Sequence, residues 1–564
     1  MTSSISNQTD QINRRNFLKT NAAVIAGVAL ASFGTNTAQA ADAKVIRFGF
    51  VGLGGRGRGV MSNLLSIKGT TVTAVCDIDP NALAAAKRIV TSKGHKEPAG
   101  YTGDSDYKKL MEREDVDAVI IATPWDLHTP MSVYSMKAGK PVGCEVPIAY
   151  TLEECWELIK TWEETGTPCM QMENWSFRPD NLAVLNMIRL GMLGRMTHGH
   201  CAYSHDCTDH WYFDSSTGNP RWGAQFLIDH NRAQYPTHQQ GPMISWMDIN
   251  CGDYYDTITS TATDCKSVYD YFERRFPGHP ASKIKYKQGD IVTSVVRTKQ
   301  GKTIVINYDM HSPRPYDNRW TVQGTAGIYN EQRDAVYLTG ISPQYHQWES
   351  FKPYHEKYQH PWARESFGGH GGADGIMLTQ MVKALQNKTQ FPLSLYDGVL
   401  MAAVGPLSEM SIAKGSAPVK VPDFTRGKWK TRKPDFAVVD LTEYKNKADM
   451  KLEQIGQWYS GKITEKYAPM DFDITDKIDK SGKCMVKFQY THGSHQLAIE
   501  KVQLICAGQV LATDTHRGIT GINNQNNYYE LDASKVIQGK SCLIRAFVQS
   551  EGGTDSNGKI YLIK

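Results

Sequence analysis

The stretch "VIRFGFVGLGGRG", residues 45–57, joins an apolar run to a cluster of glycines. The run "VIRFGFV" has the β-branched and aromatic composition of a buried strand. Gly52, Gly54 and Gly57 follow it with the spacing G-x-G-x-x-G, and a helix-like segment comes next. A strand, this glycine spacing and a helix in that order are typical of the dinucleotide-binding βαβ unit. We therefore predict a Rossmann domain at the start of the folded chain.

Each part of this motif indicates a contact with a dinucleotide. Gly52 makes a tight turn, Gly54 lets the backbone approach a pyrophosphate at the helix N-terminus, and Gly57 allows close helix packing. Asp77 lies near the end of the next strand-like run and can accept hydrogen bonds from a ribose diol. Its charge would repel a 2′-phosphate, so NAD is favoured over NADP, although Arg56 leaves NADP open.

Short apolar runs alternate with helical patterns through the first part of the chain. After the opening motif, the runs are residues 71–79, 116–124 and 139–147. Alternation of this kind predicts an α/β fold with a parallel, doubly wound sheet. We place this domain at residues 41–150.

The remaining chain changes its pattern twice. Residues 151–435 mix helical segments with β-rich runs, which predicts an α/β domain with an open antiparallel sheet. Residues 436–462 are polar and charged, as in a linker. Residues 463–564 alternate apolar and polar positions between turns, which predicts a small C-terminal β-sandwich. Three roles stay open for this sandwich: glycan binding through "NNYYELD" (526–532), contact with another subunit, or capping of the catalytic domain.

The first forty residues have the organisation of an export signal. Arg14 and Arg15 precede an apolar run at 22–33, and Ala38-Gln39-Ala40 offers a small-residue cleavage site. Paired arginines before such a run resemble a twin-arginine signal. A buried helix fits less well, because the run is short and its flanks are those of a signal. Residues 1–40 are therefore predicted to be a signal peptide of a periplasmic or cell-surface protein.

Composition narrows the class of protein. The 564 residues are 40% hydrophobic and 21% charged, as in an ordinary globular chain too long for one core. The net charge of +5 is scattered, so no nucleic-acid partner is expected. No stretch after the signal is long and apolar enough to predict a membrane span. The eleven cysteines are odd in number and include no CxxC, so most are expected to be buried thiols.

Two further motifs carry a family resemblance. "ATPWDLH" (122–128) and the strand end "GCEVPIAY" (143–150) resemble cofactor-site motifs of the glucose–fructose oxidoreductase and inositol dehydrogenase superfamily. Most members of that superfamily have Glu-Lys-Pro at the strand end, and the lysine helps to move the proton of the hydroxyl being oxidised. Here Val146 stands in place of that lysine.

A narrower resemblance extends over residues 10–430 and rests on several long motifs in one order. They are similar to those of glycoside hydrolase family 109, the NAD-dependent α-N-acetylgalactosaminidases, which also have a Glu-Val-Pro strand end. The resemblance does not include the C-terminal β domain. The motifs are "YPTHQQGP" (235–242), "DINCGD" (248–253), "PRPY" (313–316), "GGHGG" (368–372) and "PLSEMSIAKGSAPVKVPDFTRG" (406–427).

This resemblance implies two sets of contacts. The sugar contacts that it implies are Tyr203, Tyr235, Pro236, Thr237, His238 and Tyr316. The NAD contacts that it implies, with the three glycines above, are Gly55, Arg56, Asp77, Trp125, Asp126, Leu127, His128, Glu145, Val146, Asn174 and Tyr235.

The resemblance also implies a reaction without net redox change. NAD⁺ takes a hydride from C3 of the sugar, the resulting ketone acidifies the C2 proton, and loss of that proton expels the glycosidic group. Water then adds and the hydride returns, so a tightly bound NAD is recycled in each turnover. A histidine is well suited to acid–base chemistry near neutral pH and a tyrosine can relay a proton, so we expect His238 and Tyr235 to be catalytic. Val146 fits a site in which tyrosine and histidine move the protons.

Two positions depart from the family pattern. The family has an arginine where this chain has Gly223, and a common tyrosine is replaced by Phe177. Both positions fall among substrate or near-substrate residues, so the sugar is left open. Asp206, His210 and His230 are metal-binding residue types, but their spacing fits no standard site and we predict no metal.

The leading hypothesis is an exported NAD-dependent glycosidase that acts on a glycan or glycoside, with a homo-oligomer as an open possibility. One alternative is a net sugar oxidoreductase of the same superfamily. Another is a non-catalytic glycan-binding relative, which the changes at Gly223 and Phe177 suggest.

Overall fold

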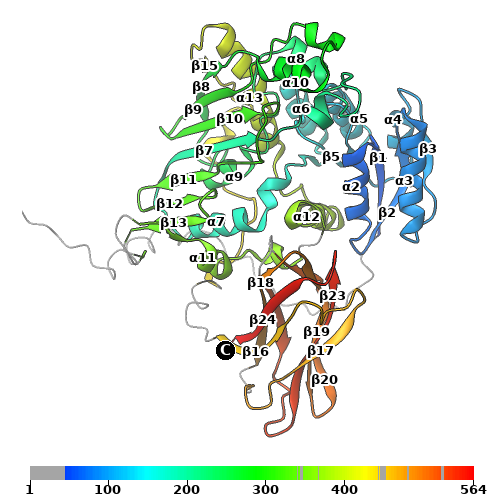
Figure 1. Cartoon of the computed structure of the whole chain (residues 1–564), viewed down its shortest axis with the longest axis vertical. Coiled ribbons are helices and arrows are strands. Elements are labelled where there is room, and N and C mark those ends of the chain that lie inside the picture. The colour runs from blue at the N-terminus through cyan, green and yellow to red at the C-terminus, as the bar shows by residue number, and fades with distance from the viewer. Residues whose placement is uncertain are drawn as a thin grey trace, which may run out of the picture. The chain divides into compact units, whose positions relative to one another are not determined.

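The computed structural model describes residues 45–563 apart from 340, 343–346, 366–367, 443, 445–451, 479–481 and 522–525. Figure 1 shows the chain. The predicted signal peptide, residues 1–40, lies outside the described residues. Within the described ranges, no helix combines the length and the apolar character that a membrane crossing requires.

The glycine-rich motif follows the central strand of a six-stranded sheet (blue and cyan in Figure 1), as predicted. All paired strands are parallel, in the order β3-β2-β1-β4-β5-β6. In β1 every side chain except that of Arg47 is buried, as in a strand covered on both faces. The strand order reverses between β1 and β4, and α/β proteins bind ligands at such a switch point. The strands are β1 Ile46–Val51, β2 Thr70–Cys76, β3 Ala99–Tyr101, β4 Ala118–Ile121, β5 Val142–Cys144 and β6 Cys169–Gln171.

Helices cover this sheet and connect its strands. The last of them, α6, begins with a capping box in which Thr151 and Glu154 bond each other's backbone N–H. Strand β6 follows α6, so the sheet extends past residue 150, where we predicted the domain to end. Strand β6 is hard to recognise in the sequence, because it is three residues long and ends in a buried glutamine. The helices are α2 Gly55–Leu64, α3 Pro80–Ser92, α4 Tyr107–Met111, α5 His128–Lys137 and α6 Leu152–Thr165.

The second domain contains the predicted open sheet, with nine strands in the order β14-β13-β12-β11-β7-β10-β9-β8-β15. Its pairs are antiparallel except β7 with β10, a parallel pair that the sequence analysis did not predict. About one hundred residues separate these two strands, long enough for the crossover that parallel pairing needs. The strands are β7 Met196–Ser204, β8 Tyr255–Ala262, β9 Val292–Thr298, β10 Thr303–Asp309, β11 Thr321–Gly324, β12 Gly327–Asn330, β13 Ala335–Leu338, β14 Glu349–Ser350 and β15 Val419–Lys420.

Two long helices join the first two domains. Helix α12 packs against α2, and α13 packs against α6 and β8. One continuous hydrophobic core accordingly runs from Ile46 to Tyr444. The helices of this part are α7 Pro179–Arg189, α8 Ala224–Asp229, α9 Gly241–Trp246, α10 Ser267–Arg275, α11 Lys352–Lys357, α12 Ala373–Asn387 and α13 Leu395–Ala413.

The C-terminal part contains two antiparallel sheets, as predicted, around a separate core. Strand β16 lies inside the segment 436–462, which the sequence analysis predicts to be a linker. The sequence of the strand, "LEQIGQW", alternates between apolar and polar residues too weakly to indicate a strand. The strands of one sheet are β16 Leu452–Trp458, β24 Ser556–Ile563, β18 Lys483–Gly493 and β22 Asn526–Asp532. Those of the other are β17 Ala468–Asp473, β23 Cys542–Glu551, β19 Gln496–Cys506, β20 Gln509–Asp514 and β21 Gly518–Thr520.

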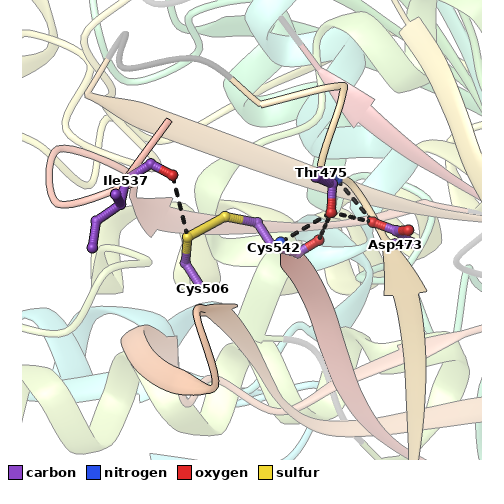
Figure 2. Close-up of a disulfide and its surroundings, with 5 residues drawn as sticks. All are labelled: Asp473, Thr475, Cys506, Ile537 and Cys542. Atoms are coloured by element: carbon purple, nitrogen blue, oxygen red, sulfur yellow. Dashed lines mark hydrogen bonds between the residues drawn. A yellow bond between two sulfur atoms is a disulfide. The ribbon is translucent and has the colours of Figure 1, made fainter. Parts of the chain in front are cut away.

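One disulfide, Cys506–Cys542, joins β19 to β23 in this sandwich (Figure 2). Thr475 flanks it by accepting a hydrogen bond from the Cys542 backbone N–H at 3.1 Å. The other nine cysteines lie outside this disulfide, and seven of them are buried, which agrees with the expectation of buried thiols.

The segment "NNYYELD" packs against other parts of the chain. Tyr529 is fully buried, and the Tyr528 hydroxyl donates to the Glu356 backbone carbonyl at 3.2 Å. The Glu356 carboxylate in turn accepts from buried Lys487 at 2.6 Å and from Gln489 at 2.8 Å. These tyrosines therefore support the sandwich and its contact with α11, and they do not form an exposed platform for a glycan.

The close approach at Gly57 provides a test of the predicted nucleotide turn. A Cβ at residue 57 would lie 2.0 Å from the Gly52 carbonyl oxygen, whereas a Cβ at Gly59 in the same helix would meet nothing within 4 Å. Gly57→Ala is expected to lower the free energy of unfolding by about 1–3 kcal/mol through overpacking. Gly59→Ala, the matched control, should raise it by about 0.5–1 kcal/mol through helix propensity. Urea unfolding of the two variants checks this; equal stabilities would contradict the packing account.

Candidate active site

The glycine turn leaves room for a phosphate where the motif predicts it. Gly52 has φ +86°, and a Cβ there would lie 2.4 Å from the Ala122 carbonyl oxygen, so this position needs glycine. A Cβ on Gly54 or Gly55 would meet nothing within 4 Å, so these residues leave the N-terminus of α2 open. A free helix N-terminus beside open space is a ready anion site.

Asp77 is held beside this turn. One of its carboxylate oxygens accepts from the Leu53 backbone N–H at 2.5 Å, and the other accepts from the Asp79 N–H at 2.8 Å. Each oxygen keeps a second lone pair that could accept from a ribose hydroxyl. The geometry fits the role that the sequence predicts for Asp77.

Arg56 connects the two domains at the end of the turn. Its guanidinium contacts Glu145 after β5 at 2.7 Å and Asp374 in the first turn of α12 at 2.7 Å. Burial alone would lower the pKa of Arg56, but Glu145 and Asp374 outweigh it and raise the pKa above the usual value. Burial alone would likewise raise the pKa of Asp374, whereas Arg56 and His370 hold it well below its usual range. In this structure the Arg56 guanidinium therefore binds these two carboxylates.

His128 has a supporting position. Its ring is buried, and its two nitrogens lie 2.8 Å from the carbonyl oxygens of Pro147 and Thr123. The histidine thus braces the turn that contains Val146, which is itself buried. Both ring nitrogens are thus engaged with the backbone, and the NAD contact that the resemblance implies for His128 stays a prediction. The neighbouring Asp126 and Leu127 are exposed.

The strongest candidate for catalysis is a buried chain of three side chains. Oε2 of Glu173 lies 2.7 Å from Nδ1 of His238, and Nε2 of His238 lies 3.1 Å from the Tyr235 hydroxyl oxygen. With Nδ1–H donating to the carboxylate, Nε2 is the acceptor for the tyrosine proton. Burial, with Glu145 and Glu173 adding to it, raises the pKa of Tyr235, so the phenol is protonated at neutral pH. The three groups can therefore pass a proton from a substrate oxygen to His238.

The sequence motif "YPTH" indicates Tyr235 and His238, but it does not indicate Glu173. The glutamate lies two residues after β6, next to Asn174, which the resemblance had already singled out. A carboxylate in an apolar stretch of sequence was the available signal. Its Oε1 also accepts from the Trp175 N–H at 3.0 Å, so both oxygens are fixed.

Tyr203 and Tyr316 lie beside this chain. The ring of Tyr203 is 5.0 Å from that of Tyr235 and 5.8 Å from that of Tyr316, measured between centroids. Tyr316 is 41% exposed, so part of this residue is open to a ligand. Pro236 and Thr237 are buried in the same loop as His238, which gives them a supporting position.

Trp125 forms the adjacent wall. It is buried and packs on Tyr150, Trp211, Trp222, Phe226 and Tyr235, with ring centroids between 4.9 and 6.4 Å apart. Aromatic side chains line many small-molecule sites, so this cluster is compatible with a binding site beside Tyr235.

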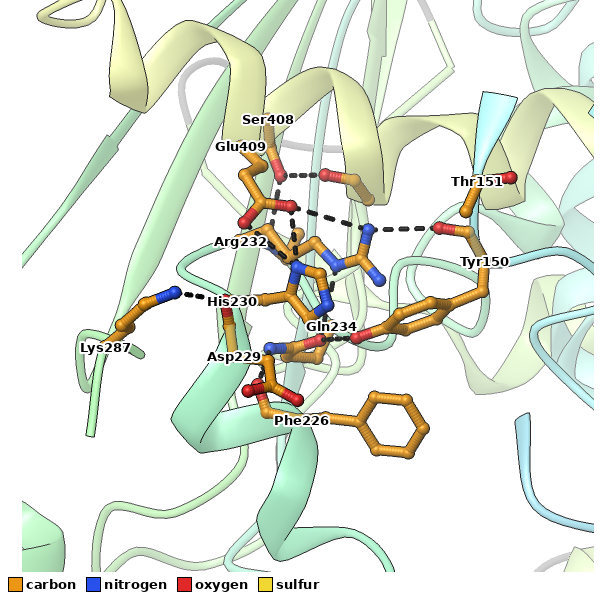
Figure 3. Close-up of polar contacts among 12 residues, drawn as sticks. Tyr150, Thr151, Phe226, Asp229, His230, Arg232, Gln234, Lys287, Ser408 and Glu409 are labelled. Carbon is orange, nitrogen blue, oxygen red and sulfur yellow. Dashed lines mark hydrogen bonds and ion pairs between the residues drawn. The ribbon is translucent and has the colours of Figure 1, made fainter. Parts of the chain in front are cut away.

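Neither nearby arginine takes the place of the family residue at Gly223. Arg232 is buried beneath the loop, where it donates to the Tyr150 carbonyl at 3.0 Å and lies 3.7 Å from Glu409 (Figure 3). Arg221 pairs with Asp214 at 2.9 Å on the surface. A Cβ at Gly223 itself would lie 2.6 Å from the Trp211 carbonyl oxygen, so this backbone has no room for a side chain.

Phe177 lies in the hydrophobic core. Its ring is fully buried against Trp362 and Phe436, with centroids 6.0 and 5.1 Å away. The sequence analysis placed this position among substrate or near-substrate residues, and the structure instead gives it a packing role. Gly223 therefore remains the one departure that bears on the sugar.

The residues present fit a bound dinucleotide. The glycine turn is open, Asp77 is oriented, and the buried Oδ1 of Asn174 has no hydrogen-bond partner in the described part of the chain. Asn174 Nδ2 donates to Asp374 at 2.8 Å, so its oxygen points elsewhere and could accept from an amide such as that of nicotinamide.

Comparison with known proteins agrees with this geometry. Residues 46–172 match the model of the oxidoreductase family, NAD-binding Rossmann fold, and residues 177–431 match that of the glycosyl hydrolase 109 C-terminal domain. Residues 11–31 match the twin-arginine translocation pathway signal sequence, which confirms the predicted signal type.

Similar proteins cover most of the chain. A glycosyl hydrolase family 109 protein of Shewanella pealeana is 38% identical over 75% of this chain and 98% of its own length. A protein of the same description from Solibacter usitatus is 36% identical over 75% and 100%. In fold, the chain is similar to a levoglucosan dehydrogenase solved with NADH, with a TM-score of 0.53, 19% identity and coverage of 67% and 99%. It is equally similar to an NAD binding oxidoreductase from Klebsiella pneumoniae, with a TM-score of 0.53, 19% identity and coverage of 68% and 100%.

The ion pair of Asp374 with Arg56 predicts a pH dependence of stability. Because the pKa of Asp374 is lower in the folded chain, its contribution is present above the unfolded value of about 3.9 and is lost as the pH falls below it. Asp374→Asn should lower the free energy of unfolding at neutral pH. Because Arg56 is partly exposed, the loss should lie between the roughly 1 kcal/mol of an exposed ion pair and the roughly 3–5 kcal/mol of a buried one. Urea midpoints measured from pH 7 down to acid should also fall less steeply in this variant.

The control for this experiment is Asp264→Asn. Asp264 is exposed and lies 3.8 Å from Lys266, so its replacement should leave both the midpoint and its pH dependence unchanged. If Asp374→Asn and wild type lost stability in parallel on acidification, the assigned role of Asp374 would be wrong.

Proposed function

We propose that this chain, which belongs to glycosyl hydrolase family 109, is an exported NAD-dependent glycosidase that ends each turnover with no net redox change. The observation that carries the proposal is the buried chain Glu173–His238–Tyr235 beside the carboxyl ends of the parallel strands. An ordinary dehydrogenase of this superfamily would use a lysine at the position of Val146. Here a histidine and a tyrosine supply the proton transfer instead.

The bound NAD⁺ would supply one function, the reversible removal of a hydride from C3 of the sugar. The protein then has to move three protons: from the C3 hydroxyl, from C2 once the neighbouring ketone has acidified it, and onto the leaving oxygen. Loss of the C2 proton breaks the glycosidic bond by elimination, and water adds to the resulting enone. Glycosidases that work through NAD are a known exception to the two-carboxylate mechanism.

The side chains present can be assigned to these proton transfers. Tyr235 would accept the C3 hydroxyl proton as it gives its own proton to Nε2 of His238, and Glu173 would stabilise the imidazolium. Tyr203, which burial keeps protonated by raising its pKa, would donate a hydrogen bond to the enolate or to the leaving oxygen. Tyr316 would bind an outer hydroxyl of the sugar.

Export agrees with a recycled cofactor. The twin-arginine route carries folded proteins, so the chain could leave the cytoplasm with NAD already bound. We infer that NAD is held tightly and that the protein acts in the periplasm or at the cell surface. A homo-oligomer is compatible with this proposal but not required by it.

A second candidate is a net sugar oxidoreductase. It is motivated by the solved structures of similar fold, which include levoglucosan dehydrogenase. It predicts accumulation of a keto-sugar and dependence on an added acceptor. A non-catalytic glycan-binding protein, motivated by Gly223, predicts tight sugar binding without turnover.

The mechanism predicts exchange at one carbon. Protein purified without added NAD, incubated in D₂O with a panel of aryl glycosides of both anomers, should release the aglycone and a sugar that carries deuterium at C2. The label should be read by mass spectrometry and NMR of the released sugar. Hydrolysis without deuterium at C2 would rule out the elimination route.

Glu173 should matter for turnover more than for binding. Glu173→Gln keeps the shape but removes the charge that stabilises the His238 imidazolium, so kcat should fall by roughly 100-fold or more. Tyr235→Phe should have a similar effect, and both variants should retain bound NAD. Tyr254→Phe is the matched control, because that buried hydroxyl donates to the Pro422 carbonyl away from the site. Normal kcat in Glu173→Gln would remove the glutamate from the mechanism.

A further inference from the structure

The loop after β7 contains a second cluster of reactive side chains that the proposed mechanism does not use. Its sequence is "HDCTDH", residues 205–210. One donor atom from each of His205, Cys207 and His210 lies within 4.8 Å of the other two. The loop runs into a π-helical turn at Thr208–Tyr212, which brings the second histidine back toward the cysteine.

The acidic residues of the loop are engaged elsewhere. Asp206 accepts from the Thr208 backbone N–H at 3.1 Å, and Asp209 binds Tyr271 at 2.7 Å and also Arg275. His230, which the sequence analysis grouped with Asp206 and His210, contacts Glu409 at 3.0 Å. The donors left are therefore two imidazoles and one thiol, a set that suits zinc and similar transition metals rather than magnesium or calcium.

His205 has the outer contact that metal-binding histidines commonly make. Its Nδ1 lies 3.1 Å from the Tyr203 hydroxyl oxygen, so Nε2 is the nitrogen left for a metal. A hydrogen bond at the second ring nitrogen fixes the ring and its tautomer. Cys207 is buried and His210 is exposed. An ion could therefore enter from solvent on the side of His210 and bind the buried thiol.

We propose that His205, Cys207 and His210 bind one zinc ion, or another divalent metal of the same preference, with the fourth coordination position open. The rings of His205 and Tyr316 lie 4.9 Å apart, so this position is beside the predicted sugar contacts. An ion there could take a water or a sugar oxygen as its fourth ligand. Binding forms a metal–sulfur bond at Cys207 and releases the thiol proton to solvent.

Metal at this site would also orient Tyr203. With Nε2 of His205 on the metal, Nδ1 must carry the proton and donate it to the Tyr203 oxygen. The Tyr203 hydroxyl proton is then free to point toward the substrate. This inference goes beyond the proposed glycosidase function, and it can be tested without any turnover.

The test measures metal binding in the full chain, purified with a tag that contains no histidine. The protein is stripped with a chelator, dialysed, and titrated with Zn²⁺ and separately with Co²⁺. We expect one equivalent of zinc per chain and a cobalt spectrum with thiolate charge-transfer absorption. His210→Ala and Cys207→Ser should each weaken zinc binding by at least about tenfold, the loss that even an outer-contact change can cause.

The controls separate a metal site from a folding defect. His210 is exposed, so His210→Ala should fold normally, as thermal unfolding and NAD content can verify. Cys251→Ser alters a half-buried cysteine outside the cluster and should leave zinc stoichiometry and the cobalt spectrum unchanged. No retained zinc in wild type, or an unchanged cobalt spectrum in Cys207→Ser, would overturn the proposal. Glycosidase activity that persists without metal would leave the proposed function intact.

Discussion

The ion pairs of Arg56 hold together the parts of the molecule that the site requires. The guanidinium comes from the first turn of α2, Glu145 follows β5, and Asp374 begins α12. One cation thus connects the nucleotide turn, the end of the parallel sheet and a helix from the second domain. Asn174 joins the same group through Asp374. The helix that follows the glycine turn is thereby tied to residues of the second domain.

The sequence predicted the parts of the fold that long periodic patterns specify. The parallel sheet, the mixture of helices and strands that follows it and the C-terminal sandwich all follow from apolar spacing. Strands β6 and β16 did not, because one is three residues long and the other alternates weakly. The parallel pairing of β7 with β10 depends on a long crossover, which no local pattern reveals.

The site was predictable only where a motif marked it. Tyr235 and His238 stand in one motif, and the structure brings them together. Glu173 lies sixty-five residues from His238, and only the fold places it on the imidazole. His128 is the opposite case. It belongs to a cofactor motif, but its ring nitrogens contact the backbone carbonyls of Pro147 and Thr123 and so support the end of the strand. The cluster at 205–210 depends on a π-helical turn, so spacing in sequence did not indicate it.

The proposed mechanism requires that the cofactor is used and restored within each turnover. The most direct test counts aglycone released per bound NAD in protein purified without added cofactor or acceptor. The account predicts release in large excess over bound NAD, free sugar in equal amount, and no keto-sugar. Release that stops near one equivalent per chain, with a keto-sugar formed in the same amount, would contradict it.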